Sequence, residues 1–179
     1  MSPAPDRVRA LSAEAIRQAR PRLAEILIDC VAAGASIGFL DPLSRSDADA
    51  YWSRVQRAVA AGGCILLGAQ LDGGPLAGTV QLDIDTLPNQ PHRATVSKLL
   101  VHTGARRQGL GEALMRELER EALAAGRWLL TLDTATGDAE RLYERLGYAR
   151  AGSIPDYAMN PDRSLTATTF YYKRLSHSA

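Results

Sequence analysis

The sequence has few of the residues that mark disulfide-rich or metal-binding proteins. Its 179 residues include only two cysteines and three histidines. Cys30 and Cys64 both lie in apolar runs, so we expect two buried free thiols rather than a disulfide framework or a catalytic cysteine. The histidines are scattered at His92, His102 and His177, which predicts surface or loop positions and no bound metal.

Neither a strong charge of one sign nor a long apolar run is present. The formal net charge is +1 at pH 7 and charged residues make up 23%, which gives no electrostatic basis for binding nucleic acid or an anionic membrane. No apolar run approaches the length that crosses a bilayer, and the opening MSPAPDRVRALS lacks the apolar core of a signal peptide. We therefore expect a cytoplasmic protein, with residues 1–179 forming one domain that has room for a full-sized core.

The residue patterns predict strands and helices that alternate along the chain. A short strand is expected at 7–11, followed by a helix over 12–34 that Pro21 kinks or divides. Ser46 and Asp49 resemble the capping box of a second helix. Further on, the patterns predict strands at 64–71, 76–85, 93–102, 127–134, 148–154 and 166–175, and helices at 110–126 and 138–147. This order indicates one mixed α/β domain.

The segment LLVHTGARRQGLGEALMREL, residues 99–118, passes from an apolar strand through arginines and glycines into a helix. The first N–H groups of a helix have no intrahelical acceptor, and with the helix dipole they form a site for anions. Gly109 and Gly111 let the backbone approach a ligand closely, and Arg106 and Arg107 add positive charge. The segment suits a pyrophosphate, although an ordinary helix start with solvated arginines explains it equally well.

Two other phosphate-binding loops fit this segment less well. A Walker A loop ends in Gly-Lys-Ser/Thr, which is missing here. The dinucleotide fingerprint needs a third glycine where Leu114 stands, and Asp133, at the position of its acidic residue, supports that fingerprint only weakly.

Two motifs at this spacing resemble the GNAT superfamily of N-acetyltransferases. Residues 106–111, Arg-Arg-Gln-Gly-Leu-Gly, match its acetyl-CoA signature, and residues 139–150, AERLYERLGYAR, match a later block of the family. The resemblance implies the GNAT fold, a mixed sheet of six to seven strands that is splayed between strands 4 and 5 and flanked by about four helices. Within the superfamily, GASIGFL, SKLLVH and PDRSLTATTFYYKRL resemble the tabtoxin resistance acetyltransferases, which inactivate a β-lactam toxin.

The resemblance implies that acetyl-CoA, with no metal, enters between the two splayed strands. The backbone of Leu100 and Val101 would pair with the pantetheine arm as an added strand does. Thr136 stands where the family often has an asparagine that contacts the pantetheine, and its hydroxyl would partly replace that contact. The pyrophosphate would be held by backbone amides and two arginine side chains, in the run Arg106, Arg107, Gln108, Gly109, Leu110, Gly111 and Glu112.

The resemblance also implies direct transfer of the acetyl group to an amine in a ternary complex. Tyr143 occupies the position of the family's general acid, with a core-packed helix residue as the alternative. Asp133, at the end of an apolar strand, is the candidate base because partial burial there would raise its pKa. A solvated strand-end aspartate is the alternative for this residue. From the sequence pattern, substrate contacts are expected from the loop residues Phe39 and Asp41. They are also expected from Gln81, Asp83 and Lys98 on central strands, for which strand alternation equally allows solvent-facing positions.

The expected acceptor is a primary amine of a small molecule, with an antibiotic or toxin-like compound as a candidate. The fold alone also allows a non-catalytic acyl-CoA-binding or toxin-sequestering module, but Tyr143 and Asp133 together favour an enzyme. The FYYK segment, residues 170–173, is expected to form an edge strand that either pairs with a second subunit or closes the sheet. A monomer or a homodimer is therefore expected, with neither nucleic acid nor a membrane as partner.

Overall fold

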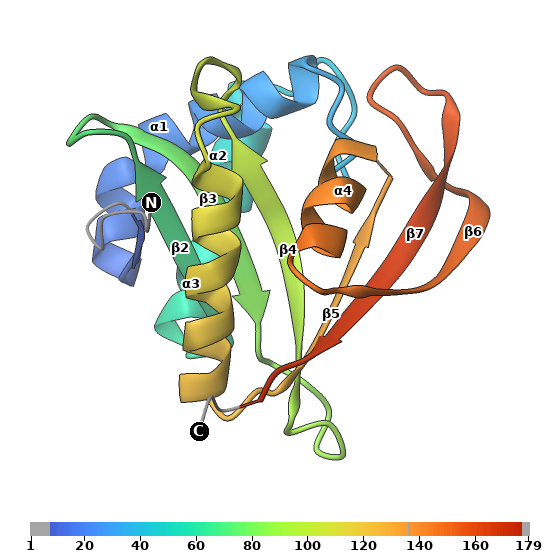
Figure 1. The fold of residues 1–179 in the computed structure, drawn as a ribbon. Helices are drawn as coiled ribbons and strands as arrows, with labels where there is room; N and C mark the ends of the chain where they lie inside the picture. Colours follow the sequence, from blue (N-terminus) through green and yellow to red (C-terminus); the bar gives the residue numbers. More distant parts are fainter. Residues whose placement is uncertain (1–7, 136, 177–179) are drawn as a thin grey trace.

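Seven strands form one mixed sheet in the structure, a computed structural model that describes residues 8–135 and 137–176. Their order across the sheet is β1-β2-β3-β4-β5-β7-β6 (Figure 1). Neighbouring strands are antiparallel except β4 and β5, which are parallel. The strands are β1 (Val8–Ala10), β2 (Cys64–Gln70), β3 (Leu76–Asp83), β4 (Arg93–Val101), β5 (Leu129–Thr134), β6 (Ala149–Met159) and β7 (Leu165–Arg174).

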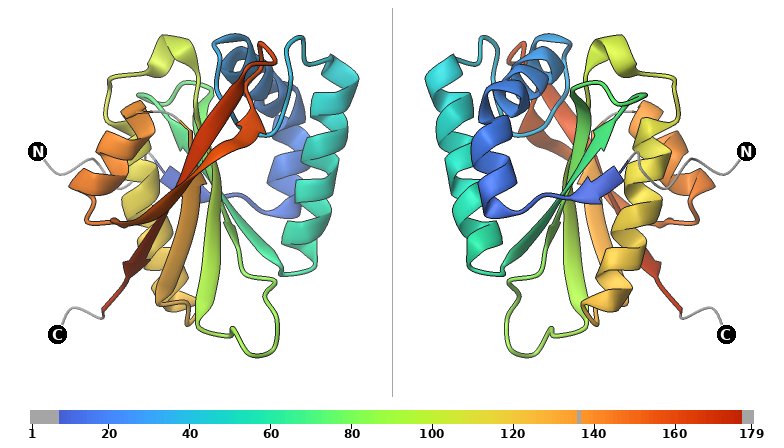
Figure 2. Two further views of the ribbon diagram at one scale, coloured as in Figure 1. Left: turned by 90° about the vertical axis from the view of Figure 1, so that its right-hand side faces the viewer. Right: turned by 90° about the vertical axis from the view of Figure 1, so that its left-hand side faces the viewer.

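Helices cover both faces of this sheet, as Figure 2 shows. On one face lie α1 (Ala13–Ala32) and α2 (Arg45–Ala60), and on the other lie α3 (Leu110–Ala124) and α4 (Gly137–Arg145). A short 3-10 helix, η1 (Thr103–Ala105), connects β4 to α3. The predicted α/β class, the mixed sheet and the four flanking helices are confirmed in the part of the chain that is described.

Each pair of helices buries an apolar stripe against the sheet. Ile16, Leu27 and Trp52 are fully buried on the side of α1 and α2, and Leu114 and Leu118 are fully buried on the side of α3. Fully burying a large apolar side chain contributes about 1.5–3 kcal/mol. These two layers therefore hold the central strands firmly in place.

Two details of the first helices bear on the sequence expectations. α1 continues through Pro21 as one helix, so the proline does not divide it, and apolar residues on both sides of it are buried. The N-cap of α2 is Ser44, whose Oγ accepts the N–H of Asp47 at 3.1 Å and donates to its carboxylate at 2.6 Å. The capping box lies two residues before the expected pair Ser46 and Asp49, because Ser44 and Asp47 offer the same spacing earlier in the chain.

The C-terminal strands also differ from the expectation. β6 extends over 149–159 instead of ending at 154, and β7 pairs with β5 on one side and with β6 on the other. The FYYK segment is therefore an interior strand, and the prediction that it forms an edge is wrong because β6 covers it. Figure 1 shows β6 and β7 projecting beyond α4 at one end of the sheet.

Candidate active site

Strands β4 and β5 pair over a short stretch and then separate. Their parallel pairing runs from Arg93–Leu129 to Thr95–Thr131. Beyond these residues β4 continues beside β3, and β5 continues beside β7, so a wedge opens in the middle of the sheet (Figure 1). The expected splay between strands 4 and 5 is confirmed. Among the described residues, no strand lies beside β4 on the side that faces the wedge.

A β-bulge redirects β4 where the wedge opens. The pairing with β3 shifts between Thr79 and Gln81, so Lys98 and Leu99 together oppose the single residue Val80. Lys98 has a φ of 52°, in the left-handed region that residues other than glycine rarely adopt. Bulges turn a side chain out of the regular alternation and are frequent beside active sites. Strand alternation in the sequence does not reveal this turn.

The hydrogen-bond register decides which backbone groups of β4 face the wedge. The N–H of His102 donates to the carbonyl of Ala77 at 2.8 Å, and this bond sets the alternation of the antiparallel pair. The backbone groups of Leu100 point to β3, and those of Val101 point away from it into the wedge. Leu100 is thus engaged with β3 and not free to pair with a ligand, which corrects the sequence expectation. Leu99 takes its place beside Val101 in the cleft described below.

The turn from β4 into α3 presents an amide cradle, which we define as the backbone N–H groups of residues 108–112. Gly109 is the N-cap of α3, with a φ of 79° and no side-chain cap, so the amides of Leu110 to Glu112 have no intrahelical acceptor. Arg107 also has a left-handed φ, of 62°, and such turns help successive N–H groups converge on an anion. A Cβ on Gly109 would meet nothing within 4 Å, so the backbone conformation requires glycine here.

A cleft of about 300 Å³ connects the wedge to the amide cradle. Leu99 and Val101 line it from β4, and Leu142 lines it from α4. The Cδ2 atom of Leu142 lies 3.3 Å from where a Cβ on Gly111 would stand. A side chain at Gly111 would therefore press against α4 and narrow the cleft.

Four arginines of the described chain line this cleft, and two of them lie outside the signature at residues 106–111. Arg106 and Arg107 come from the loop before α3, whereas Arg141 and Arg145 lie one turn apart on α4. Asp138 forms an ion pair with Arg107 at 3.7 Å and another with Arg141. Exposed pairs of this kind are weak, so both arginines can exchange Asp138 for a phosphate. The i, i+4 spacing of the two α4 arginines is the sequence signal that points to them.

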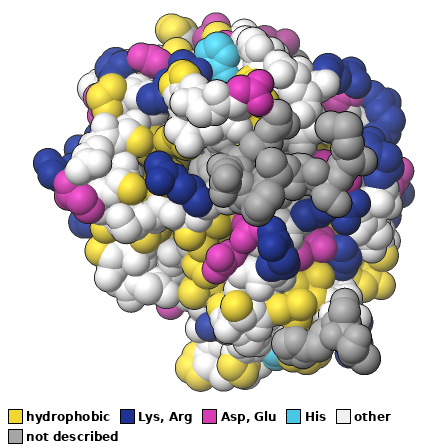
Figure 3. Space-filling model, turned by 60° about the vertical axis from the view of Figure 1, so that its left-hand side comes forward, with side chains coloured by type: hydrophobic (Ala, Val, Ile, Leu, Met, Phe, Trp, Pro, Cys, Tyr) yellow, Lys and Arg dark blue, Asp and Glu magenta, His cyan; other side chains and the backbone are white. Residues whose placement is uncertain are grey.

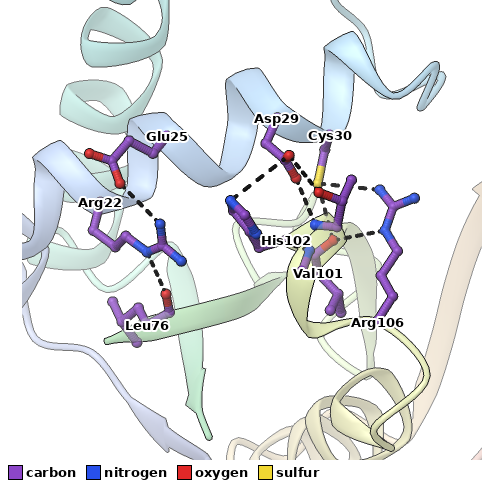
Figure 4. Close-up of polar contacts among 10 residues, drawn as sticks. Arg22, Glu25, Asp29, Cys30, Leu76, Val101, His102 and Arg106 are labelled. Atoms are coloured by element: carbon purple, nitrogen blue, oxygen red, sulfur yellow. Dashed lines mark hydrogen bonds and ion pairs between the residues drawn. The ribbon is translucent and has the colours of Figure 1, made fainter. Parts of the chain in front are cut away.

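Arg106 turns away from the amide cradle toward α1, as Figure 4 shows. Its Nε donates to the carbonyl of Val101 at 3.1 Å, and its Nη2 lies 4.0 Å from the Sγ of Cys30. The Cys30 thiol donates to the same carbonyl at 3.5 Å. Cys30 and Cys64 are free and buried, as expected, and burial raises the pKa of the Cys30 thiol. Arg106 thus ties the loop to α1 and β4 instead of pointing at the cradle.

A second cavity, of about 470 Å³, lies between β4, β5, β6 and the loop that follows α1. Much of its lining is apolar or aromatic, with contributions from Phe39, Tyr157 and Met159, and the charged side chains described in it are Lys98 and Asp133. Residues 96–98 of β4 line this cavity, and the next residues of the same strand line the cleft. One strand therefore connects the two spaces.

Lys98 brings a positive charge into this cavity without a close counterion. It forms no ion pair within the described part of the chain. Burial lowers the pKa of its ammonium, although the negative charges of Asp133 and Asp83 oppose this shift. The Nζ lies 3.9 Å from where a Cβ on Gly38 would stand, so the ammonium reaches the loop across the cavity. A desolvated cation without a partner favours an anionic ligand.

Tyr143 packs into the core from α4, the helix that lines the cleft. Its side chain is 6% exposed, and its ring centroid lies 5.8 Å from that of Tyr148 and 6.1 Å from that of Tyr171. Burial, and secondly the charge of Asp133, raise the pKa of Tyr143 well above its usual range. The ring is therefore a core residue, and the hydroxyl stays protonated at neutral pH.

Asp133 lies near the end of β5, where it lines the cavity of about 470 Å³, and it is exposed. The partial burial expected from its apolar strand is not found, because β5 has already parted from β4 at Thr131 and the residues beyond it border the open wedge. Its charge acts on both Lys98 and Tyr143. Asp133 thus lies within electrostatic reach of both side chains.

Gln81 and Asp83, two of the expected substrate contacts, lie on β3 but do not line the cavity of about 470 Å³. Gln81 is 4% exposed and donates to the hydroxyl of Tyr51 at 2.6 Å. Asp83 accepts a hydrogen bond from Ser97 at 3.1 Å. Tyr51 of α2 lies against Gln81, and neither Gln81 nor Asp83 is in the lining of the cavity.

The other expected contacts are divided between two spaces. Phe39 and Lys98 line the cavity of about 470 Å³. Asp41 lines a neighbouring cavity of about 380 Å³, which shares Ala135 with the first. Thr136 lies outside the described residues.

The described residues contain no group of three or more His, Cys, Asp or Glu side chains that could hold a metal ion. None of the helices found there is long and apolar enough to cross a membrane. On the face that Figure 3 draws, the described Lys and Arg side chains lie interspersed with Asp and Glu.

Comparison with known proteins matches both the sequence and the fold. The sequence model of the acetyltransferase (GNAT) family matches residues 22–148. The fold is similar to that of yncA from Salmonella typhimurium, solved with its cofactor acetyl-CoA, with a TM-score of 0.75 and 18% identity over 96% of this chain and 95% of that one.

Two further solved structures have similar scores. A phosphinothricin acetyltransferase from Sinorhizobium meliloti, in complex with acetyl-CoA, has a TM-score of 0.76 and 19% identity over 96% of this chain and 89% of that one. A ribosomal-protein-alanine N-acetyltransferase from Brucella melitensis has a TM-score of 0.76 and 19% identity over 94% of this chain and 99% of that one. At these identities the likeness establishes a shared fold.

Proposed function

The chain belongs to the acetyltransferase (GNAT) family, and on this premise we propose that it transfers the acetyl group of acetyl-CoA to a primary amine of a small molecule. The layout of β4 carries the proposal. Leu99 and Val101 line a cleft that ends at the amide cradle, and residues 96–98 line a charged cavity. A donor and an acceptor bound in these two spaces would meet at the wedge, as direct transfer in a ternary complex requires.

The cleft has the features that coenzyme A needs. Acetyl-CoA supplies an acyl group that is activated as a thioester. The backbone of Leu99 and the N–H of Val101 would hold the pantetheine arm as an added strand, because the carbonyl of Val101 already accepts from Arg106 and Cys30. The amide cradle would hold the pyrophosphate. Arg107 and Arg141 would neutralise phosphate charge after releasing Asp138. A backbone N–H of β4 would also polarise the thioester carbonyl.

Two side chains would move the protons of the reaction. Tyr143 keeps its proton on Oη at neutral pH because its pKa is raised, and it would donate that proton to the departing sulfur. Asp133 faces the cavity and would accept the proton that the amine must lose before it attacks.

The charges in the cavity favour an acceptor that carries an anionic group as well as an amine. Asp133 would attract the amine in its cationic form, and Lys98 would bind the anionic group. A volume of about 470 Å³ is in the range of small-molecule sites.

The compared proteins leave the acceptor open. At the same identity to this chain, one is named for phosphinothricin and another for the alanine of a ribosomal protein. The likeness of residues 161–175 to the tabtoxin resistance acetyltransferases supports an antibiotic or toxin-like acceptor.

Release of free thiol tests the proposal. The purified protein is incubated with acetyl-CoA and three sets of amines, namely amino-acid analogues, their uncharged amides, and aminoglycosides, with a reaction lacking acceptor as the control. We expect release that is fastest with amines carrying an anionic group. Tight binding of acetyl-CoA without thiol release from any set would contradict the enzyme, and it would indicate a non-catalytic acyl-CoA-binding or toxin-sequestering module.

A further inference from the structure

Asp29, on α1, contacts the loop that leads to the amide cradle. Figure 4 shows its carboxylate directed at the segment between β4 and α3. Its Oδ2 accepts the backbone N–H of Thr103 at 2.7 Å, and its Oδ1 accepts the hydroxyl of Thr103 at 2.8 Å. The Nε2 of His102 lies 3.8 Å from Oδ1. Groups from two consecutive residues of the loop therefore converge on one carboxylate of a distant helix.

The loop buries little of its own surface. Within residues 103–109 only Ala105 is buried, and the others are exposed. The other hydrogen bonds at its start are local, such as that from the N–H of Gly104 to Nδ1 of His102 at 3.2 Å and that from the N–H of Ala105 to the carbonyl of His102 at 2.8 Å. Segments with so few buried apolar contacts open easily unless they are anchored. The anchor here comes from α1, through Asp29 and through the thiol of Cys30 on the carbonyl of Val101.

We propose that Asp29 is a positioning residue for the coenzyme. Its side chain holds the amide cradle in its binding geometry and does not touch the ligand. This inference rests on the proposed function, because the ligand of the cradle is acetyl-CoA. Hydrogen bonds to an ionised acceptor are roughly twice as strong as neutral ones, and the side chain of Asp29 is only 23% exposed. A cradle that is ordered in advance lowers the entropy lost when the coenzyme binds.

Calorimetry of acetyl-CoA binding tests this role with variants on both sides of the contact. We expect Asp29→Ala to weaken binding about tenfold and Thr103→Val to weaken it less, since the Thr103 N–H keeps its acceptor. Asp29→Asn keeps an oxygen for that N–H but loses the charge, so it should weaken binding less than Asp29→Ala does. Glu25→Ala is the matched control, because Glu25 lies one turn earlier on α1 and pairs with Arg22 at 3.0 Å, away from the loop in Figure 4.

Kinetics with a truncated donor separate positioning from general damage to the fold. With acetyl-CoA, Asp29→Ala should raise the donor KM about tenfold and leave kcat and the acceptor KM unchanged. With S-acetylpantetheine, which lacks the diphosphate, the variant and the wild type should react equally, because the amide cradle then has nothing to hold. A defect that persists with the truncated donor would overturn the inference.

The remaining outcomes are also decisive. Unchanged acetyl-CoA affinity in Asp29→Ala would overturn the positioning role alone. If Asp29→Ala does not fold, unchanged affinity in Thr103→Val would overturn that role instead. If the wild-type chain itself bound no acetyl-CoA, the proposed function would fail, and this inference with it.

Discussion

Lys98 and Asp133 face one cavity from two strands that have stopped pairing. β4 and β5 part after Thr95 and Thr131, and each strand then places a charged side chain in the opening. The two charges influence each other without forming an ion pair. Because the positive and negative groups stay apart, both are available to a ligand that carries the opposite pair of charges.

Replacing Lys98 with methionine should weaken acceptor binding selectively. Methionine keeps the apolar stem and removes the charge, so we expect the KM of an amine with an anionic group to rise about tenfold. The KM of acetyl-CoA and of uncharged amines should stay the same, as thiol release will show. Lys173→Met is the matched control, because the ammonium of Lys173 bonds to Glu119 and to the carbonyl of Leu146, each at 2.7 Å, and its loss should affect stability alone.

The free energy of unfolding should depend on pH through the titration of Lys98, whose destabilising effect should shrink as the pH rises. The pKa of Lys98 in the folded chain lies below its ordinary value of 10.5, so between these two values the unfolded chain binds more protons. The destabilisation that comes from burying the charged ammonium of Lys98 is fully present below its folded pKa. It disappears as the pH rises from the folded pKa to 10.5. Thermal unfolding should therefore show Lys98→Met to be more stable than wild type at neutral pH, with the difference shrinking as pH approaches 10.5. A difference that does not vary with pH would contradict this account.

Tyr143→Phe should lower kcat by roughly tenfold or more, with little change in acetyl-CoA affinity, because it removes a proton donor and keeps the packed ring. Since the pKa of Tyr143 is raised from 10.0, ionisation of this hydroxyl should not reduce the wild-type rate between pH 7 and 10. Tyr171→Phe is the control, because the Tyr171 hydroxyl bonds to Glu144 at 3.2 Å, outside the proposed chemistry. An unchanged rate in Tyr143→Phe would exclude Tyr143 as the acid.

The two carboxylates near Lys98 should differ in their effect on the rate. Asp133→Asn removes the proposed base from the cavity, and we expect kcat to fall roughly tenfold or more. Asp83→Asn changes a side chain outside the cavity lining that accepts from Ser97, so its effect on kcat should be less than about threefold. Steady-state rates at saturating donor measure kcat in both variants. A larger loss of kcat in Asp83→Asn than in Asp133→Asn would indicate Asp83 as the base instead.

Gly109→Ala and Gly126→Ala should separate backbone strain from coenzyme binding. Their φ values are 79° and 72°, and a Cβ at either position would meet open space. Each substitution should therefore cost about 1–2 kcal/mol of stability through the same left-handed strain. Only Gly109 lies in the amide cradle, so calorimetry should show loss of acetyl-CoA affinity for Gly109→Ala alone. Equal affinities in the two variants would count against the cradle.

The sequence by itself determined the class of fold, the order of its elements and the start of α3. These features depend on neighbouring residues: apolar residues at helical or strand spacing define the elements, and Gly109 and Gly111 mark the turn in which α3 begins. The burial of Cys30 and Cys64 follows from the same local patterns. Even the misplaced capping box was an error of two residues within one turn, since Ser44 and Asp47 obey the same rule.

Only the tertiary structure decided which residues meet at the wedge. The direction of Lys98 depends on a bulge against β3, and the exposure of Asp133 depends on the parting of two strands. Instead of facing the amide cradle, Arg106 bonds to the carbonyl of Val101 and lies near the thiol of Cys30, which is far away in the chain. Such outcomes depend on register and on contacts between distant segments. A single sequence holds no periodic signal for these, because the partner that sets each side chain's direction belongs to another element.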